Sequence, residues 1–518
     1  MTAKAAELLP SQAGFKLQQS TGKPDSKQLA RLDQLIVVLP EQPAATLWSQ
    51  IPEGRALEKL ARKRQLKGLP LQTRLKNTAG TSLIVGRLAG SGKGNKQPSS
   101  FALLSYAGTI AKAALQDKPT SVGILVRGFD AECEAAIVQA MLLALSAHNF
   151  SLPNYKSSTT PAHPLKTAHI FNTEQRLDLE RTLSEADSLN LARWLTVQPP
   201  NKLDAGGYRK AVSALAKQHG WKMSFLNEAK LKQLGAGAFL AVAQGNANKD
   251  AGIVHLQYRP KNSGKNPALA LVGKGIIFDT GGVNLKPFKG MLDMHADMAG
   301  SAVALATLQA LTELQVPYAI DCWLAVTENL ISNTAYKSRD IVTASNGVTI
   351  EVIHTDAEGR MALADTLALA GKAKPAVIID FATLTGSCVH ALTDRYSGVL
   401  TNRPQLNQLL IDAGRDSGER VWPFPMDDDF DDDLSSKVAD VLQCATAGGG
   451  DHIQAARLLQ RFVPDNSTWV HLDLSAANRS AGLAQVPGNI TGFGVRYATN
   501  LILNHLDDLA TAAKGNNT

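Results

Sequence analysis

The chain has 518 residues, of which 44% are hydrophobic and 19% are charged. This length exceeds one ordinary hydrophobic core and this composition is too apolar for a disordered protein, so two domains of a globular α/β protein are expected. The formal charge of +7 is unevenly divided, because residues 271–518 hold 18 basic and 28 acidic side chains, a net of −10, which leaves +17 for residues 1–270. The basic half alone would favour an acidic partner such as nucleic acid.

Two other classes of protein are disfavoured. No apolar run approaches the roughly 20 residues needed to span a bilayer, and the first residues lack the apolar core of a signal peptide, so we expect a cytoplasmic protein without a membrane partner. The cysteines lie far apart and form no Cys-x-x-Cys pair, which favours buried, reduced thiols over disulfides or a sulfur-ligated zinc: Cys133, Cys322, Cys388 and Cys444.

The first third of the chain alternates apolar runs with stretches whose apolar residues recur every three or four positions. We expect strands over residues 34–39, 81–88, 121–126 and 167–171, and helices over residues 44–66, 101–115 and 131–147. This alternation predicts a doubly wound α/β domain over residues 1–172. A helix-spaced segment from Glu174 to Val197 stops at Pro199-Pro200 and predicts a connecting helix within residues 173–200.

Residues 201–518 alternate in the same way, with longer apolar strands, and predict a larger α/β/α domain with a mixed central sheet. Asn346-Gly347 lies between two β-branched runs and predicts a hairpin over residues 340–355. The other expected elements are strands over residues 268–278, 318–326 and 376–379, and helices over residues 301–314 and 360–370.

Charged side chains gather in and after the strands of this second domain. The candidates are Lys274, Asp279, Lys286, Asp297, Asp356 and Glu358. In an open α/β sheet, ligands bind at the carboxyl ends of strands, and several carboxylates meeting there would repel unless a divalent metal pair neutralised them. Taken singly, each has an ordinary interpretation, because an Asp-x-Glu after a strand is usually a solvated turn or helix start, and a lysine in an apolar strand usually extends to solvent.

Three segments in order favour the metal site. VGKGIIFDTGGVNLKP, DMHADMAGSAVAL and HTDAEGRMALADTLAL resemble the signature segments of the leucyl (cytosol) aminopeptidase family of dinuclear metallopeptidases. ARWLTVQPPNKL, the hairpin AYKSRDIVTASNGVTIEV, IIDFATLTGSCVHAL and WVHLDLSAAN also resemble segments of that family. The resemblance covers most of Leu191 to Leu503.

The resemblance implies a metal-dependent aminopeptidase that removes the N-terminal residue, with a Leu-like preference, from peptides with a free N-terminus. It implies two divalent ions, Mn²⁺ or Zn²⁺, and five ligands of which Asp279 and Glu358 bridge the ions: Lys274, Asp279, Asp297, Asp356 and Glu358. It further implies that Lys286 stabilises the oxyanion of the attacked carbonyl and that Arg360 holds a bicarbonate acting as general base.

The same resemblance implies a pocket for the N-terminal side chain, a macro-like first domain and a homohexamer. The pocket would be lined by Met294, Thr383, Leu384 and Gly386, with core packing an equal alternative for Met294 and Leu384. Several positions depart from the commonest family pattern and weaken any statement on metal or side-chain preference: Thr280, Asn284, His295, Ala296 and His354.

A second hypothesis assigns nucleic-acid binding or a regulatory role to the basic first half. Its support is the net charge of +17 and the basic stretch from Arg55 to Lys76. A helix with one solvated basic face explains that stretch equally well, and neither interleaved aromatic residues nor a known nucleic-acid-binding motif accompanies it. The acidic run from Asp427 to Asp433 is interpreted as a solvated loop.

Overall fold

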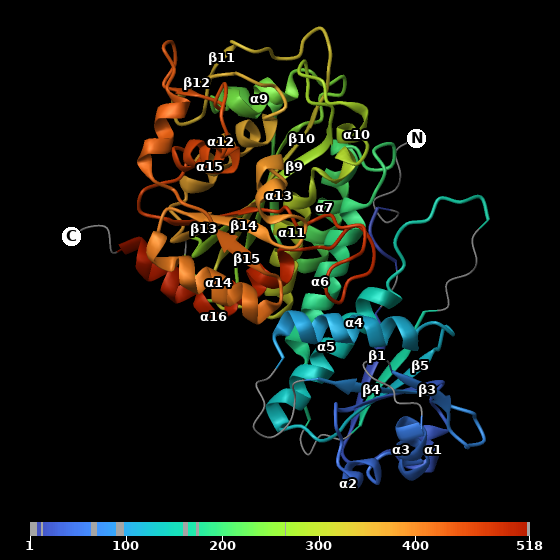
Figure 1. Ribbon diagram of the computed structural model, residues 1–518. Coiled ribbons are helices and arrows are strands. Elements are labelled where there is room, and N and C mark those ends of the chain that lie inside the picture. Colours follow the sequence, from blue (N-terminus) through green and yellow to red (C-terminus); the bar gives the residue numbers. More distant parts are fainter. Residues whose placement is uncertain are drawn as a thin grey trace. The chain divides into compact units, whose positions relative to one another are not determined.

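The computed structural model describes residues 8–11, 14–63, 70–89, 98–158, 164–171, 176–264 and 266–514. The chain divides into two compact units (Figure 1). The N-terminal unit comprises Gln12–Asp187 with Ala481–Gly488, and the C-terminal unit comprises Met1–Ser11, Ser188–Ser480 and Asn489–Thr518. The division falls within helix α6 (Glu180–Thr196), inside the segment expected to connect two domains.

The N-terminal unit is built on a six-stranded sheet. Its strand order is β1-β6-β5-β2-β4-β3, and all neighbouring pairs are parallel except β3 with β4. The strands are β1 (Lys16–Ser20), β2 (Gln34–Pro40), β3 (Leu71–Arg74), β4 (Ser82–Leu88), β5 (Ser121–Val126) and β6 (Thr167–Phe171). The helices of this unit are α1 (Ser26–Leu29), α2 (Ala45–Trp48), α3 (Gly54–Lys63), α4 (Ser100–Ala114) and α5 (Ala131–Asn149).

Both faces of this sheet are covered. Alternate residues of β2 point to opposite faces, as the period of a strand requires. Ile36 and Val38 belong to the apolar cluster of α4 and α5, whereas Val37 belongs to a second cluster with Trp48 and Leu57 of α2 and α3. The predicted doubly wound arrangement is therefore confirmed.

The helix expected over residues 44–66 is interrupted, and that prediction is wrong in detail. Helix α2 ends at Trp48 and α3 begins at Gly54, with Pro52 between them. Proline has no N–H for a helical hydrogen bond, and the next residue, Glu53, has a positive φ of 52°. Helix α3, which contains the first part of the basic stretch from residue 55 to 76, buries Gly54, Leu57 and Ala61 and exposes its basic side chains. This fits a helix with one solvated basic face. Residues 64–69 of the stretch lie outside the described residues.

The C-terminal unit is built on an eight-stranded mixed sheet of order β15-β14-β17-β13-β9-β10-β8-β7. Its four central strands, β17, β13, β9 and β10, run parallel, so their carboxyl ends meet at one edge. The strands are β7 (Lys222–Asn227), β8 (Gly252–Tyr258), β9 (Leu269–Asp279), β10 (Ile320–Asn329), β13 (Val377–Ala382), β14 (Ser397–Thr401), β15 (Val421–Pro423) and β17 (Thr468–Asp473).

Helices pack on both faces of β9. A Cβ added at Gly273 would lie 2.4 Å from Cα of Ser301 in α11, whereas Ala270 and Val272 belong to the cluster that contains α9 and α12. This three-layer arrangement confirms the predicted α/β/α fold with a mixed central sheet. The helices are α7 (Ala205–His219), α8 (Glu228–Gln233), α9 (Gly237–Ala243), α10 (Phe288–Met291), α11 (Ala299–Glu313), α12 (Glu358–Gly371), α13 (Gly386–Leu392), α14 (Asn407–Ser417), α15 (Asp451–Gln460) and α16 (Val495–Lys514), with 3₁₀ turns η2 (Met294–Ala296), η3 (Pro404–Leu406) and η4 (Asp428–Leu434).

The predicted hairpin is present in a small sheet of β11 (Ile341–Thr343), β12 (Thr349–Glu351) and β16 (Val441–Leu442). Gly347 has a φ of 93°, the left-handed conformation that the Asn-Gly turn predicts. The buried carboxylate of Asp365 in α12 accepts hydrogen bonds from the backbone N–H of Ser345 at 2.6 Å and of Phe239 at 2.8 Å. This side chain therefore ties the hairpin and α9 to α12.

Two further sequence predictions can be compared with the structure. The acidic run is largely exposed to solvent, as expected, but most of it forms η4 and not a loop, and its Asp431 pairs with Arg457 at 2.8 Å. The four cysteines are free and buried, as expected. Among the described residues, no helix has both the length and the apolar character needed to cross a membrane.

Candidate metal centre

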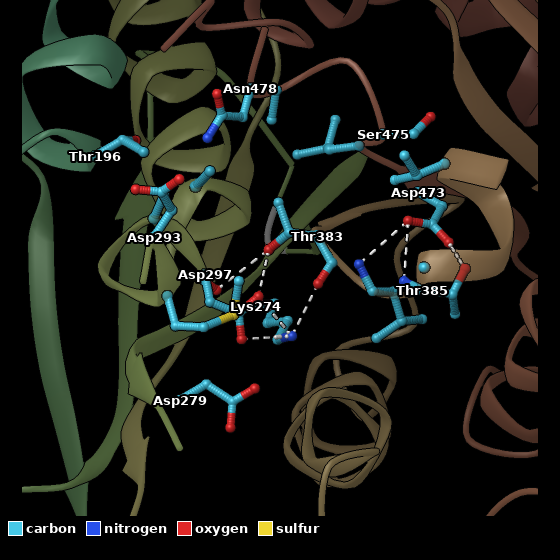
Figure 2. A pocket seen from close by; sticks show the side chains of 18 of the residues that line it. Thr196, Lys274, Asp279, Asp293, Asp297, Thr383, Thr385, Asp473, Ser475 and Asn478 are labelled. Carbon is cyan, nitrogen blue, oxygen red and sulfur yellow. Dashed lines mark hydrogen bonds and ion pairs between the residues drawn. The ribbon is translucent and has the colours of Figure 1, made fainter. Parts of the chain in front are cut away.

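A cavity of about 470 Å³, part of whose lining is drawn in Figure 2, is lined by all but one of the predicted metal-binding, catalytic and substrate-pocket residues. The exception is Arg360. The cavity lies where β9, β13 and β17 end, the edge at which parallel strands place ligand sites. The predicted residues that line it are Lys274, Asp279, Lys286, Met294, Asp297, Asp356, Glu358, Thr383, Leu384 and Gly386.

Two glycines make the site sterically possible. Gly281 follows β9 with a φ of 84°, and a Cβ there would lie 2.5 Å from the carbonyl oxygen of Asn284 and 3.0 Å from Oδ1 of Asp356. Gly359, in the first turn of α12, leaves room for Lys274, whose Nζ would lie 2.8 Å from an added Cβ. The turn after β9 and the start of α12 can therefore approach each other only because these positions lack side chains.

Lys274 lies in the middle of β9 and is 2% exposed. Its Nζ lies 2.8 Å from Oδ2 of Asp297 and 2.9 Å from Oε1 of Glu358, and it donates to the backbone carbonyl of Thr383 at 2.9 Å. Burial acts to lower the pKa of Lys274, but the carboxylates of Asp297, Glu358 and Asp279 outweigh it and raise the pKa. The amine is thus enclosed by acids and does not extend to solvent.

Lys286 occupies the other side of the same acidic group. Its Nζ lies 2.8 Å from Oδ2 of Asp279 and also contacts Oδ1 of Asp356. Burial again acts to lower the pKa, and the negative charges of Asp279 and Glu358 raise it overall. The side chain is 15% exposed, so it remains accessible from the cavity.

The site holds more carboxylates than ammonium groups. Ligand oxygens of Asp279, Asp356 and Glu358 lie within 4.8 Å of one another. With Asp297 there are four carboxylates against the two lysines, a net charge of −2 when all are ionised. Burial, followed by the charge of Asp279, raises the pKa of Glu358 to about 8, and burial raises the pKa of Asp297 to about 6.

These oxygen donors and the Lys274 amine fit divalent cations. Hard and borderline ions such as Mn²⁺ and Zn²⁺ take carboxylate ligands, and a cation would oppose both the burial and the mutual repulsion that raise the carboxyl pKa values. The geometry brings together all five predicted metal ligands around one cavity.

A family model for the catalytic domain of the cytosol aminopeptidase family matches residues 190–499. The chain belongs to the cytosol aminopeptidase family. This membership confirms the resemblance inferred from the three segments and the predicted class of metallo-aminopeptidase.

Relatives and solved structures agree with this assignment. A probable cytosol aminopeptidase of Syntrophotalea carbinolica is 39% identical over 373 residues, which cover 71% of this chain and 74% of the relative. One from Parasynechococcus marenigrum is 34% identical and covers 91% of this chain and 96% of the relative. The bottromycin maturation enzyme BotP in complex with Mn has a TM-score of 0.79 at 28% identity, with 92% of this chain and 99% of that chain covered. A tomato leucine aminopeptidase mutant has a TM-score of 0.81 at 25% identity, with 96% and 98% covered.

The structure shows residues beside the site that the sequence analysis did not single out. Asn329, the last residue of β10, donates from Nδ2 to Oδ1 of Asp279 at 2.8 Å and to the carbonyl of Thr355 at 3.0 Å. The buried hydroxyl of Tyr336 donates to the same carbonyl at 2.8 Å. These bonds fix the loop before Asp356, and the position of Asn329 at a strand end is the signal that could have identified it.

Asp473, the last residue of β17, was also missed. Figure 2 shows its carboxylate directed at the loop after β13, where it accepts from the hydroxyl of Thr385 at 2.6 Å and from the N–H of Leu384 at 3.2 Å. Burial raises its pKa, although the neighbouring His471 and these donors act to lower it. In the same loop, the Thr383 hydroxyl donates to Oδ1 of Asp297 at 2.7 Å, so Asp473 holds a loop that in turn positions a predicted ligand.

Arg360 lies in the first turn of α12 but away from the cavity. Its side chain is 2% exposed, and its Nη2 donates to both carboxylate oxygens of Asp451 at 2.8 Å. Among the departures from the family pattern, His354 is exposed and its Nδ1 accepts from the N–H of Asp356 at 3.3 Å. His354 therefore contacts the backbone of a predicted ligand.

Proposed function

We propose that this family member is a dimetal aminopeptidase that cleaves the N-terminal residue, with a Leu-like preference, from peptides with a free N-terminus. The convergence of four carboxylates and two lysines on one cavity is the observation that carries the proposal. Two divalent ions, Mn²⁺ or Zn²⁺, would be held by Lys274, Asp279, Asp297, Asp356 and Glu358. When bound, such ions supply Lewis acidity and lower the pKa of water at the site.

The chain's own residues divide the remaining work. The Lys286 ammonium, on the accessible side of the acids, would stabilise the negative charge that develops on the attacked carbonyl oxygen. Lys274 can act as a ligand only after losing its proton, which nearby dications favour. Asn329 and Thr383 hold the carboxylates of Asp279 and Asp297 in place through hydrogen bonds.

The substrate side chain would occupy the part of the cavity beside Met294, Thr383, Leu384 and Gly386. Other apolar residues that line the same cavity support a Leu-like preference: Val389, Leu474, Ala477 and Ile490. A cytoplasmic location and a homohexamer complete the proposal. The first is supported by the names of the curated cytosol aminopeptidases that the chain resembles, and the second only by the family resemblance.

The proposal is tested with the purified full chain loaded with Mn²⁺ or Zn²⁺. Leucine-p-nitroanilide and Leu-Gly should be hydrolysed, and removal of the metal by a chelator should stop the reaction until metal is restored. N-acetyl-leucine-p-nitroanilide is the matched control, because it lacks the free amine and should not be cleaved. Failure to cleave either free-amine substrate with either metal would refute the proposed function.

A further inference from the structure

The partner of Arg360 is a carboxylate of this chain. Nη2 of Arg360 donates to Oδ1 and Oδ2 of Asp451 at 2.8 Å each, and Nη1 donates to the backbone carbonyl of Gln443 at 3.3 Å. Burial acts to lower the pKa of Arg360, but the charge of Asp451 outweighs it and raises the pKa. The family resemblance places a bicarbonate on this guanidinium, so its free hydrogen-bonding capacity decides whether that anion fits.

A guanidinium binds a planar anion at two points in only two ways. The anion bridges either Nε and Nη2 or Nη1 and Nη2, and both arrangements need an N–H of Nη2. Nη2 donates to both oxygens of the Asp451 carboxylate, so an anion that bridges through Nη2 would have to share this group with a negative charge already bound to it. Nε is buried without a hydrogen-bond partner among the described residues, but it is a single donor and cannot form a two-point contact alone. The residues present therefore do not fit a bicarbonate bound to Arg360 as the resemblance implies.

Asp451 is held in this position by the start of α15. Gly450 precedes the helix with a φ of 78°. His452, the residue after Asp451, is fixed by Ser387, whose Oγ accepts from the His452 N–H at 3.0 Å. Gln454 donates to Oδ2 of Asp433 at 2.8 Å. A carboxylate in the first turn is also favoured by the helix dipole. The aspartate is thus presented by a helix that is anchored on two sides.

We propose that Asp451 is the built-in anion of Arg360, so that the proposed aminopeptidase reaction requires no added bicarbonate. The inference rests on the proposed function. A carboxylate tethered to the same chain faces Arg360 at an effective concentration on the order of millimolar or more, against which a dissolved anion must compete. Asp451 acts as a positioning residue: it holds the guanidinium of Arg360. Arg360 lies two residues after the predicted ligand Glu358, at the start of α12.

The test compares activity with and without sodium bicarbonate in carbonate-depleted buffer. The wild type should change by less than about twofold, whereas Asp451→Ala should lose about tenfold or more in kcat/KM and regain activity when bicarbonate is added. Asp451→Asn, which conserves shape, provides the same comparison if the alanine variant does not fold. Asp431→Ala is the matched control, since it breaks the Asp431–Arg457 pair of the same helix and should leave the enzyme insensitive to bicarbonate.

A binding measurement makes the result independent of turnover. Titration calorimetry should detect bicarbonate binding to Asp451→Ala that is absent from the wild type and from Asp451→Ala combined with Arg360→Gln. Stimulation of the wild type by bicarbonate would overturn the inference, as would an Asp451→Ala enzyme that keeps full activity and binds no bicarbonate, because the pair would then be only a tie between helices. If no protein cleaves any peptide, the proposed function fails while calorimetry still decides the role of Asp451.

Discussion

The two units share a parallel α/β core, yet their strands end in different side chains. In the C-terminal unit, β9, β10 and β17 end at Asp279, Asn329 and Asp473, and all three contact the site. In the N-terminal unit, four of the five parallel strands end at apolar residues, Pro40, Leu88, Val126 and Phe171, and the edge strand β1 ends at Ser20. The same architecture therefore carries polar strand ends at a site in one unit and mostly apolar strand ends in the other, because the residues at the strand ends are not determined by the fold.

The largest expected effect comes from replacing Asp279, the carboxylate of the site at the end of β9. Asp279→Asn removes one charge from a group within 4.8 Å of Asp356 and Glu358 and should lower kcat/KM by about 10³ or more, with loss of bound metal by elemental analysis. Glu41→Gln is the control from the other unit, since Glu41 directly follows β2 and is exposed. Equal losses in the two variants would contradict the contrast between the units.

The next effect concerns the lysine that faces the cavity. Lys286→Ala should reduce kcat by about 10²–10³ with little change in KM, because the group stabilises charge that develops only in the transition state. Lys289→Ala, three residues further along and exposed on α10, should leave both constants unchanged. A rise in KM at constant kcat would assign Lys286 to substrate binding and not to oxyanion stabilisation.

Sequence patterns predicted the fold well where the signal was local. The apolar strand through Lys274 and the Asn-Gly turn at residues 346–347 correspond to β9 and the β11–β12 hairpin. The polar strand β1, with sequence KLQQS, has no apolar run and was missed, because its place at the sheet edge depends on pairing with β6. The break at Pro52 could have been read from the sequence.

The surroundings of the ligands were harder to predict because they depend on distant segments. Arg360 and Asp451 are 91 positions apart, and no local pattern pairs an arginine of one helix with the first residue of another. Asp473 contacts a loop 88 positions earlier through adjacent parallel strands. Their positions at strand ends could have identified Asn329 and Asp473 from the sequence. The pairing of Arg360 with Asp451 could be identified only from the tertiary structure.

The smallest expected effect concerns Asp365, a buried acid that stabilises the fold and, unlike the acids of the metal site, lies outside the cavity. Burial raises the pKa of Asp365 to about 6, although the backbone donors of Phe239 and Ser345 act to lower it. Its pKa in the folded state is thus above the ordinary value of 3.8, so the folded chain binds more protons than the unfolded chain between these values and loses stability as pH rises through them.

Asp365→Asn removes this titration. The free energy of unfolding of the wild type relative to Asp365→Asn should therefore fall by roughly 2.4 kcal/mol between pH 4 and pH 7, measured by denaturant titration on the metal-loaded chain. Asp412→Asn, an exposed carboxylate 3.1 Å from Arg415, should show no such trend. Because Asp365 lies outside the cavity, its variant should retain metal binding, and a loss of metal together with stability would show that the hairpin anchor and the catalytic site are coupled.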